Sequence, residues 1–152
     1  LTMWYWSWMQ YRVTMETLNI EDPKTRLVKA IKCITMKVEE DQDFQEINES
    51  KLNQIVNRDS AKVYHCKNVQ KDNEEGFFLA YKDFVEGIAQ IILEIKTDFK
   101  YPHMLVTTII EGSHHQRFFA EHLPRLTDVI DGEDAISNFY LEMVKRELKI
   151  EQ

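Results

Sequence analysis

The stretch 77-FFLAYKDFVEGIAQIILEIK-96 decides the expected fold, because its apolar side chains recur at the spacing of an α-helix. One apolar stripe consists of Phe84, Ile88, Ile91 or Ile92, and Ile95. Val85, Ala89 and Ile92 widen this stripe, which is typical of a helix that is buried on two sides. We therefore expect this helix to be the centre of the fold, with Gly87 allowing another helix to approach closely.

The composition is typical of a folded helical protein. Only 4 glycines and 3 prolines occur in 152 residues, too few for a turn-rich β-sandwich or barrel. A hydrophobic fraction of 43% beside 30% charged residues indicates a globular chain. We predict an all-α fold, an irregular bundle of five to seven helices that forms a single module over residues 1–152. Because the chain starts with Leu, we expect it to be an excerpt of a longer protein.

Apolar periodicity predicts further helices on both sides of this centre. They are expected over residues 3–18, from Pro23 to about Val38, as a short helix near Ser50, over 102–110 and on to 123, and from Asp131 or Glu133 to the C-terminal end. Residues 104–110 are rich in β-branched side chains, so a strand remains an alternative there. The acidic run 39–49 and the polar stretch 57–76 are expected to be irregular. Leu27, Ile31, Ile34, Phe139, Tyr140 and Met143 are expected to pack on the central helix.

The opening stretch 4-WYWSWMQY-11 contains all three tryptophans of the chain. Trp4, Trp8 and Tyr11 share one side of a helix, and this side is expected to pack on the domain. Trp6 lies about 160° from Trp8 around a 3.6-residue helix, so we expect Trp6 to contact a partner. Trp and Tyr side chains, with Met, are enriched in interface cores. The predicted partner-binding residues are Trp4, Trp6, Trp8, Met9 and Tyr11.

Charge and hydropathy exclude several classes of function. The net charge of −7 argues against a nucleic-acid partner, because phosphate binding needs a basic surface. The sequence contains no apolar run of membrane-spanning length and no positively charged leader followed by an aliphatic segment. Two cysteines, Cys33 and Cys66, cannot form a disulfide framework, and Cys33 is expected in the core. We therefore expect a cytoplasmic protein without a membrane span.

Catalytic motifs are missing from the sequence. No phosphate-binding loop, dinucleotide-binding glycine motif or nucleophile elbow occurs. His65 and Cys66 are adjacent, and adjacent side chains point apart on a helix, so they do not predict a Cys–His pair. We expect no enzymatic activity, no cofactor and no small-molecule substrate.

Residues 72-DNEEGFFLAYKD-83 resemble a degenerate EF-hand calcium loop. Asp72, Glu74 and Asp83 would supply the oxygen ligands at loop positions 1, 3 and 12. However, Gly76 falls one position too early, and Asp83 is shorter than the bidentate Glu that calcium normally requires. We expect an EF-hand-like helix–loop–helix that packs without metal, and keep a calcium-responsive sensor as the alternative function.

Four candidate metal ligands, Glu111, His114, His115 and His122, lie close together in the sequence. On a continuous helix Glu111, His115 and His122 would share a side and could bind zinc or iron. Residues 112–113, Gly-Ser, are expected to break or bend this helix. We therefore favour surface histidines and expect no metal.

Two stretches resemble the helical C-terminal part of the MORN-repeat radial-spoke head proteins of cilia. They are 3-MWYWSWMQYRVTMETLNIEDPKTRLVKAIKC-33 and 77-FFLAYKDFVEGIAQI-91, about a third of the chain, whereas the MORN repeats themselves are absent. The resemblance implies a scaffold segment docked in a cytoskeletal assembly such as the ciliary axoneme. We predict a non-enzymatic protein–protein interaction module whose partners are other proteins of a larger assembly.

Overall fold

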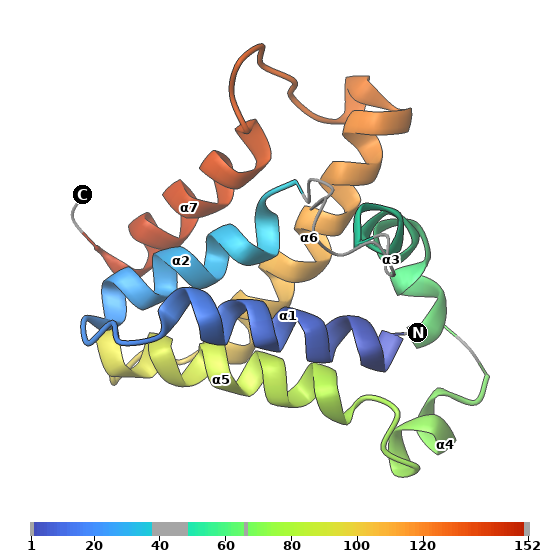
Figure 1. Ribbon diagram of the computed structural model, residues 1–152, viewed down its shortest axis with the longest axis horizontal. Coiled ribbons are helices and arrows are strands. Elements are labelled where there is room, and N and C mark those ends of the chain that lie inside the picture. Colours follow the sequence, from blue (N-terminus) through green and yellow to red (C-terminus); the bar gives the residue numbers. More distant parts are fainter. Residues whose placement is uncertain (1, 38–48, 66, 151–152) are drawn as a thin grey trace.

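The computed structural model describes residues 2–37, 49–65 and 67–150, and these residues form helices joined by turns, with no strand among them (Figure 1). The predicted all-α irregular bundle is confirmed. The helices are α1 (Thr2–Thr17), α2 (Pro23–Thr35), α3 (Glu49–Tyr64), α4 (Val69–Glu74), α5 (Leu79–Ile95), α6 (Pro102–His122), the 3₁₀ helix η1 (Pro124–Leu126) and α7 (Ala135–Leu148). Residue Val38, the run 39–48 and Cys66 lie outside the described residues. No helix in the described part of the chain has the length and apolar character needed to cross a membrane.

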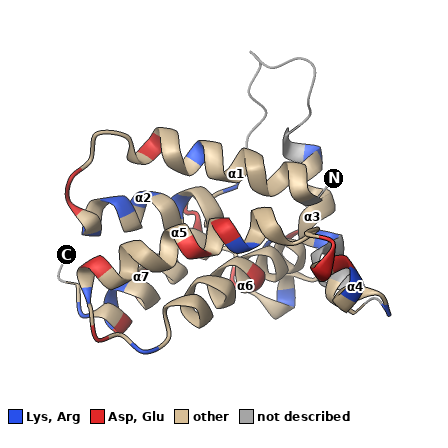
Figure 2. Cartoon of the chain, turned by 90° about the horizontal axis from the view of Figure 1, so that it is seen from below, with Lys and Arg blue, Asp and Glu red and all other residues tan. Residues whose placement is uncertain are grey.

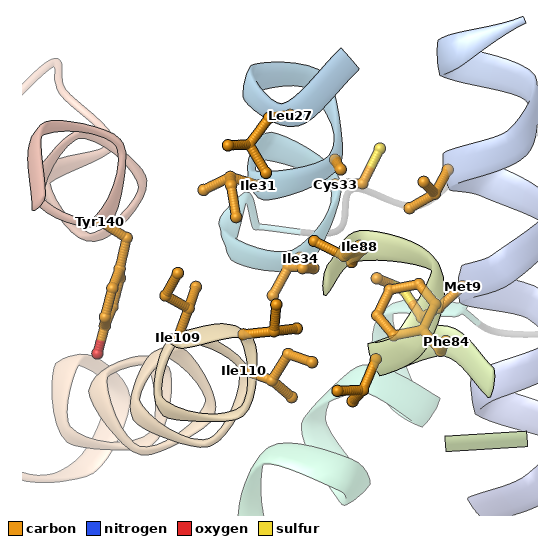
Figure 3. Packing of buried hydrophobic residues seen from close by; sticks show 14 of the residues in the cluster. Met9, Leu27, Ile31, Cys33, Ile34, Phe84, Ile88, Ile109, Ile110 and Tyr140 are labelled. Atoms are coloured by element: carbon orange, nitrogen blue, oxygen red, sulfur yellow. The ribbon is translucent and has the colours of Figure 1, made fainter. Parts of the chain in front are cut away.

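The core lies between α2, α5 and α6. Helix α5 packs against α1, α2 and α6, while α2 also contacts α6 and α7. Figure 3 shows side chains of α2, α5 and α6 converging in the middle, with Met9 of α1 on one side and Tyr140 of α7 on the other. The elements that complete the core therefore come from both ends of the chain.

The predicted central position of α5 is confirmed, because Phe84, Val85, Ile88, Ala89 and Ile92 are buried. Helix α6 is equally central. Its buried residues include Val106, Ile109 and Ile110, which are fully inaccessible to solvent. The β-branched run 104–110 is thus helical, because packing on both sides of α6 outweighs its local strand preference.

The prediction that another helix approaches closely at Gly87 was wrong. Gly87 is exposed, and no atom of another element lies within 4 Å of the place where its Cβ would be. Gly112 contacts α7 instead, since a Cβ there would lie 3.3 Å from Cζ of Tyr140 and would collide with the hydroxyl. The predicted break at residues 112–113 was also wrong, because α6 runs without interruption from Pro102 to His122.

Two aspartates cap the helices that frame the core. Asp22 accepts a hydrogen bond from the backbone N–H of Thr25 at 3.1 Å, and Pro23 begins α2 as expected. Asp134 accepts from the N–H of Ser137 at 3.2 Å, so α7 starts at Ala135 and not at Asp131 or Glu133. Cap geometry, and not acidic composition alone, sets this boundary.

Two expectations about core membership and irregular structure were wrong. Phe139 was expected on the core side of α7, but it is 58% exposed, while Tyr140 is buried and Met143 half-buried. Most of the described part of the stretch 57–76 is helical, because α3 continues to Tyr64 and α4 covers Val69–Glu74. Helix α3 packs on α6 and α1, and this tertiary contact stabilises a helix that its polar sequence does not predict.

Candidate functional site

Helix α1 turns the side opposite to the expected one toward the core. Its buried residues are Tyr5, Trp6, Met9 and Val13. Trp6 is only 3% exposed, with its ring centroid 4.3 Å from that of Tyr81 and 5.3 Å from that of Phe84, both on α5. Trp6 and Met9 were predicted to bind a partner, and this assignment needs correction, because both are covered by the chain itself.

The other side of α1 forms a candidate interaction surface, which we call the outer α1 face. It consists of Met3, Trp4, Tyr11 and Met15 of α1, together with Leu18 in the turn that follows the helix, and these side chains are between 42% and 63% exposed. Trp4, Tyr11 and Met15 lie within about 40° of one another around the helix axis. Trp8 is half-buried at the edge of this face. Of the predicted partner-binding residues, Trp4, Trp8 and Tyr11 are therefore accessible to a partner.

The large side chains of this face alternate at spacings of four and three residues, in the order Trp4, Trp8, Tyr11, Met15, Leu18. This 3.5-residue repeat is that of the a and d positions along a coiled-coil seam. Figure 2 shows α1 along one side of the molecule with most of its length free of charge. Within residues 3–18 the only charged side chains are Arg12 and Glu16, which lie beside the face and not on it.

The hydroxyls of Ser7 and Thr14, beside the outer α1 face, already have partners within the chain, whereas Nη1 of Arg12 is buried without a hydrogen-bond partner among the described residues. Ser7 donates its hydroxyl proton to the carbonyl oxygen of Met3 at 3.0 Å, and Thr14 donates to that of Gln10 at 2.8 Å. Arg12 lies over the ring of Trp8, 5.1 Å from its centroid. Covering this face would thus leave both hydroxyls hydrogen-bonded, and polar atoms buried without a partner are costly.

Beneath α1 lies a buried polar cluster that joins three helices. The Tyr5 hydroxyl donates to Oδ1 of Asn53 in α3 at 3.2 Å and lies 3.4 Å from Nε2 of His114 in α6. Because the Tyr5 proton points to Asn53, this geometry favours the His114 tautomer that donates from Nε2. Burial lowers the pKa of His114 to about 4, with a smaller contribution from the nearby His115. His114 is therefore neutral near pH 7.

A second polar group lies next to this cluster. Glu111 of α6 accepts hydrogen bonds from the hydroxyls of Tyr64, at 2.9 Å, and Tyr81, at 2.8 Å. Burial, and then the charge of Glu111, raise the pKa of both tyrosines far above the usual range. Trp6 lies between the two groups, with its ring near both Tyr81 and His114. This arrangement fixes the inner side of α1 to α3, α5 and α6.

The structure separates the four candidate metal ligands. Glu111 is engaged by two tyrosines, and His114 is buried, contrary to the expected surface position. His115 and His122 are exposed, near Phe119 and Phe118 respectively. Within the described residues no three His, Cys, Asp or Glu side chains are placed to hold a metal ion.

The predicted calcium loop does not have the shape of one. Asp72 and Glu74 lie in helix α4, and Asp83 lies in α5, so only residues 75–78 separate the two helices. An EF-hand needs a loop of about twelve residues that wraps around the ion. Gly76 does adopt a positive φ of 88°, but it serves the short turn between these helices.

A second exposed apolar surface surrounds the α6–α7 connection. Its large side chains are Leu123, Leu126, Val129, Ile130 and Phe139. All of these except Leu123 border one of two open clefts, of about 280 and 180 Å³. In the larger cleft Arg117 pairs with Asp134 at 2.8 Å and donates from Nε to the backbone oxygen of Thr35 at 3.1 Å, so this pair ties α2, α6 and α7 together.

Sequence reasoning missed part of both the surface and its support. Met3, Met15 and Leu18 were not among the predicted partner-binding residues, although the alternation of four and three residues already aligned Met15 and Leu18 with Trp4, Trp8 and Tyr11. No local pattern indicates the Tyr5–Asn53–His114 cluster, since its members are far apart in the sequence. Searches against protein-family models, curated proteins and solved structures found no match for this chain.

Proposed function

We propose that this chain is a non-enzymatic protein–protein interaction module that presents the outer α1 face to an α-helix of a partner chain. One observation carries the proposal. Helix α1 is apolar on two opposite sides, and the fold uses only one of them. The side left exposed has the spacing of a coiled-coil seam.

The energetics of this face favour binding. Trp and Tyr at the middle of an interface contribute about 2 kcal/mol or more each, and the exposed Tyr11 lies midway along the outer α1 face. Tyr5, Trp6 and Met9 anchor the opposite side, so α1 is already helical before a partner arrives. A preformed helix lowers the conformational entropy lost on binding.

The cellular setting belongs to the same proposal. A scaffold role in a cytoskeletal assembly, such as the ciliary axoneme, is supported by the sequence resemblance of residues 3–33 and 77–91 to radial-spoke head proteins. In such an assembly an exposed helical seam would hold neighbouring components together without chemistry of its own.

Affinity capture with matched variants tests the proposal. Trp4→Ser combined with Tyr11→Ser should remove the partners that the unaltered chain retains from its native source, whereas Phe139→Ser, on the second apolar surface, should keep them. Circular dichroism should show that all three proteins are equally helical. Retention of every partner by the α1 variant, or loss only with Phe139→Ser, would show that the outer α1 face is not the binding surface.

A further inference from the structure

We infer that the helix bound by the outer α1 face is α1 of a second copy, which pairs with it in antiparallel orientation about a twofold axis. This inference rests on the proposed function and names its partner. Four properties of the face support it: the spacing of its side chains, the sizes of the residues that would meet, its lack of charge and its area.

The spacing requires a helical partner. Trp4 and Tyr11 occupy d positions, while Trp8 and Met15 occupy a positions, and Leu18 follows at the next d spacing in the turn after α1. Side chains at this 3.5-residue period insert into the spaces between side chains of a facing helix. The described α1 spans about two heptads. This is short for an isolated coiled coil, but the domain core already holds the helix in shape.

An antiparallel pair matches large side chains with more slender ones. With the twofold axis between positions 9 and 10, Trp4 of one copy packs against Met15 of the second copy, and Trp8 against Tyr11. A parallel pair would instead place Trp4 against Trp4 and Trp8 against Trp8. Two bulky indole rings would then meet in each of these two layers. Antiparallel helices also align their dipoles favourably, whereas parallel helices do not.

The distribution of charge favours contact between two copies at the outer α1 face over contact at other surfaces of the molecule. The chain carries a net charge of −7, so two copies repel each other over much of their surfaces. Between Met3 and Gln10 no charged residue occurs. Arg12 and Glu16 both lie to one side of the seam, and Glu16 lies 3.9 Å from Nζ of Lys29 in the same chain. The outer α1 face is therefore a surface on which two copies can meet without charged side chains in the seam itself.

The area is sufficient for a specific dimer. The seam residues Trp4, Tyr11 and Met15 and the adjoining Met3 and Leu18 are each about half exposed. Burying them removes on the order of 500 Å² per copy, hence about 1,000 Å² in total, which reaches the lower limit of specific interfaces. We therefore expect a dimer that dissociates on dilution and not an obligate one.

Sedimentation equilibrium over a range of concentrations tests the dimer with the whole chain. The unaltered protein should show a concentration-dependent equilibrium between monomer and dimer. Tyr11→Lys should raise the dimer Kd about a hundredfold or more, because both copies lose a central anchor and bury a charge. Met15→Lys is the second variant in case Tyr11→Lys does not fold, and Phe139→Lys is the control that should still dimerise.

A charge pair tests the orientation. Trp4→Glu and Met15→Lys should each be monomeric alone, and mixing them should restore a dimer, because the carboxylate introduced in one chain then faces the ammonium group introduced in the other. Spin labels at position 18 should lie about 25 Å or more apart in the antiparallel dimer, from about seventeen residues at 1.5 Å each, and much closer in a parallel one. A short separation, or no dimer on mixing, would overturn the antiparallel pairing.

The outcomes separate this inference from the proposed function. A protein that is monomeric at every concentration, yet loses its captured partners with Trp4→Ser and Tyr11→Ser, refutes the dimer and leaves the interaction module intact. A dimer that persists in Tyr11→Lys and Met15→Lys uses another surface, and the inference is then wrong. If the monomeric protein also keeps its partners in the α1 variant, both proposals fail.

Discussion

Trp4 and Trp6 stand two positions apart in α1 and have opposite environments. Trp6 is enclosed by Tyr81, Phe84 and His114, whereas Trp4 is exposed on the outer α1 face. Two residues turn the helix by about 200°, so one face cannot hold both side chains. The same residue type therefore serves the core at one position and the surface at the other.

Replacing each tryptophan by Ala should separate these roles. We expect Trp6→Ala to lower the free energy of unfolding by about 3–5 kcal/mol, because it leaves a cavity among aromatic rings. Trp4→Ala should change the free energy of the monomer by about 0.5 kcal/mol or less. Urea titrations at low protein concentration measure both values. A large loss of stability for Trp4→Ala would mean that α1 is not oriented as described.

His114 makes the stability of the fold depend on pH. Its pKa is about 4 in the folded protein, below the usual 6.5, because burial disfavours the charged ring. As the pH falls through 6.5 the unfolded chain takes up the proton first, so stability declines from there and levels off below about 4. The total loss is about 3 kcal/mol, from roughly 1.4 kcal/mol per pKa unit.

We expect His114→Gln to flatten the decline of the free energy of unfolding between about pH 6.5 and 5. This range lies above the pH at which Asp22 and Glu86 titrate, because the pKa of each of these carboxyl groups is lowered. His115→Gln is the control, because His115 is exposed and the decline should persist. Free energies from urea titrations at several pH values give the measurement. An unchanged slope in His114→Gln would assign the acid sensitivity to other groups.

At the scale of elements, two glycines show that a close contact between helices depends on which residue of the other helix lies opposite. Gly87 and Gly112 both lie inside long helices, but only Gly112 faces another helix, at Tyr140 of α7. Tyr140 is buried, so its ring has little freedom to move away from an added methyl group. Gly112 therefore sets how closely α6 and α7 approach.

Two alanine substitutions should have opposite effects. In Gly112→Ala, overpacking against Tyr140 should cost about 1–3 kcal/mol of folding free energy. The better helix propensity of Ala should offset about 1 kcal/mol of this cost. Gly87→Ala should stabilise it by up to about 1 kcal/mol, because the site is exposed and open. Thermal and urea unfolding measure the difference. If Tyr140→Phe does not relieve the defect of Gly112→Ala, contact with the hydroxyl is not its cause.

Helix α1 shows the limit of periodicity as a guide to orientation. Its outward residues, Trp4, Tyr11 and Met15, and its inward residues, Tyr5, Met9 and Val13, both follow helical spacing. The outward stripe is the more regular of the two, and it was expected to face the core. The core selected the other stripe because Tyr5 and Trp6 meet polar and aromatic partners on α3, α5 and α6.

At the scale of the whole molecule, one core joins segments from both ends of the chain. Buried residues of α1, α2, α3, α5, α6 and α7 belong to a single cluster. The pair of Arg117 and Asp134 further links α6 to the start of α7. We therefore expect the helices to unfold together.

Tryptophan fluorescence can test this expectation, because all three tryptophans lie in α1. The urea transition followed by fluorescence should coincide with that followed by far-ultraviolet circular dichroism, which reports on all helices. Measurement at low protein concentration keeps dimer dissociation from contributing. A fluorescence transition at lower urea would show that α1 detaches before the rest of the fold.

Local patterns in the chain sufficed for the helical class, the start of α2 at Asp22–Pro23 and the burial of α5, because apolar spacing and capping act between near neighbours. Contacts between distant residues settled the rest. The orientation of α1 depends on the contact of Trp6 with Tyr81 of α5. The role of Gly112 depends on Tyr140 of α7, and the burial of His114 involves contact with Tyr5 of α1. Spacing gives the angle between side chains around a helix, but it does not give the direction of the core when two opposite sides are apolar. That choice left Trp4, Tyr11 and Met15 on the surface, where the proposed function places the partner.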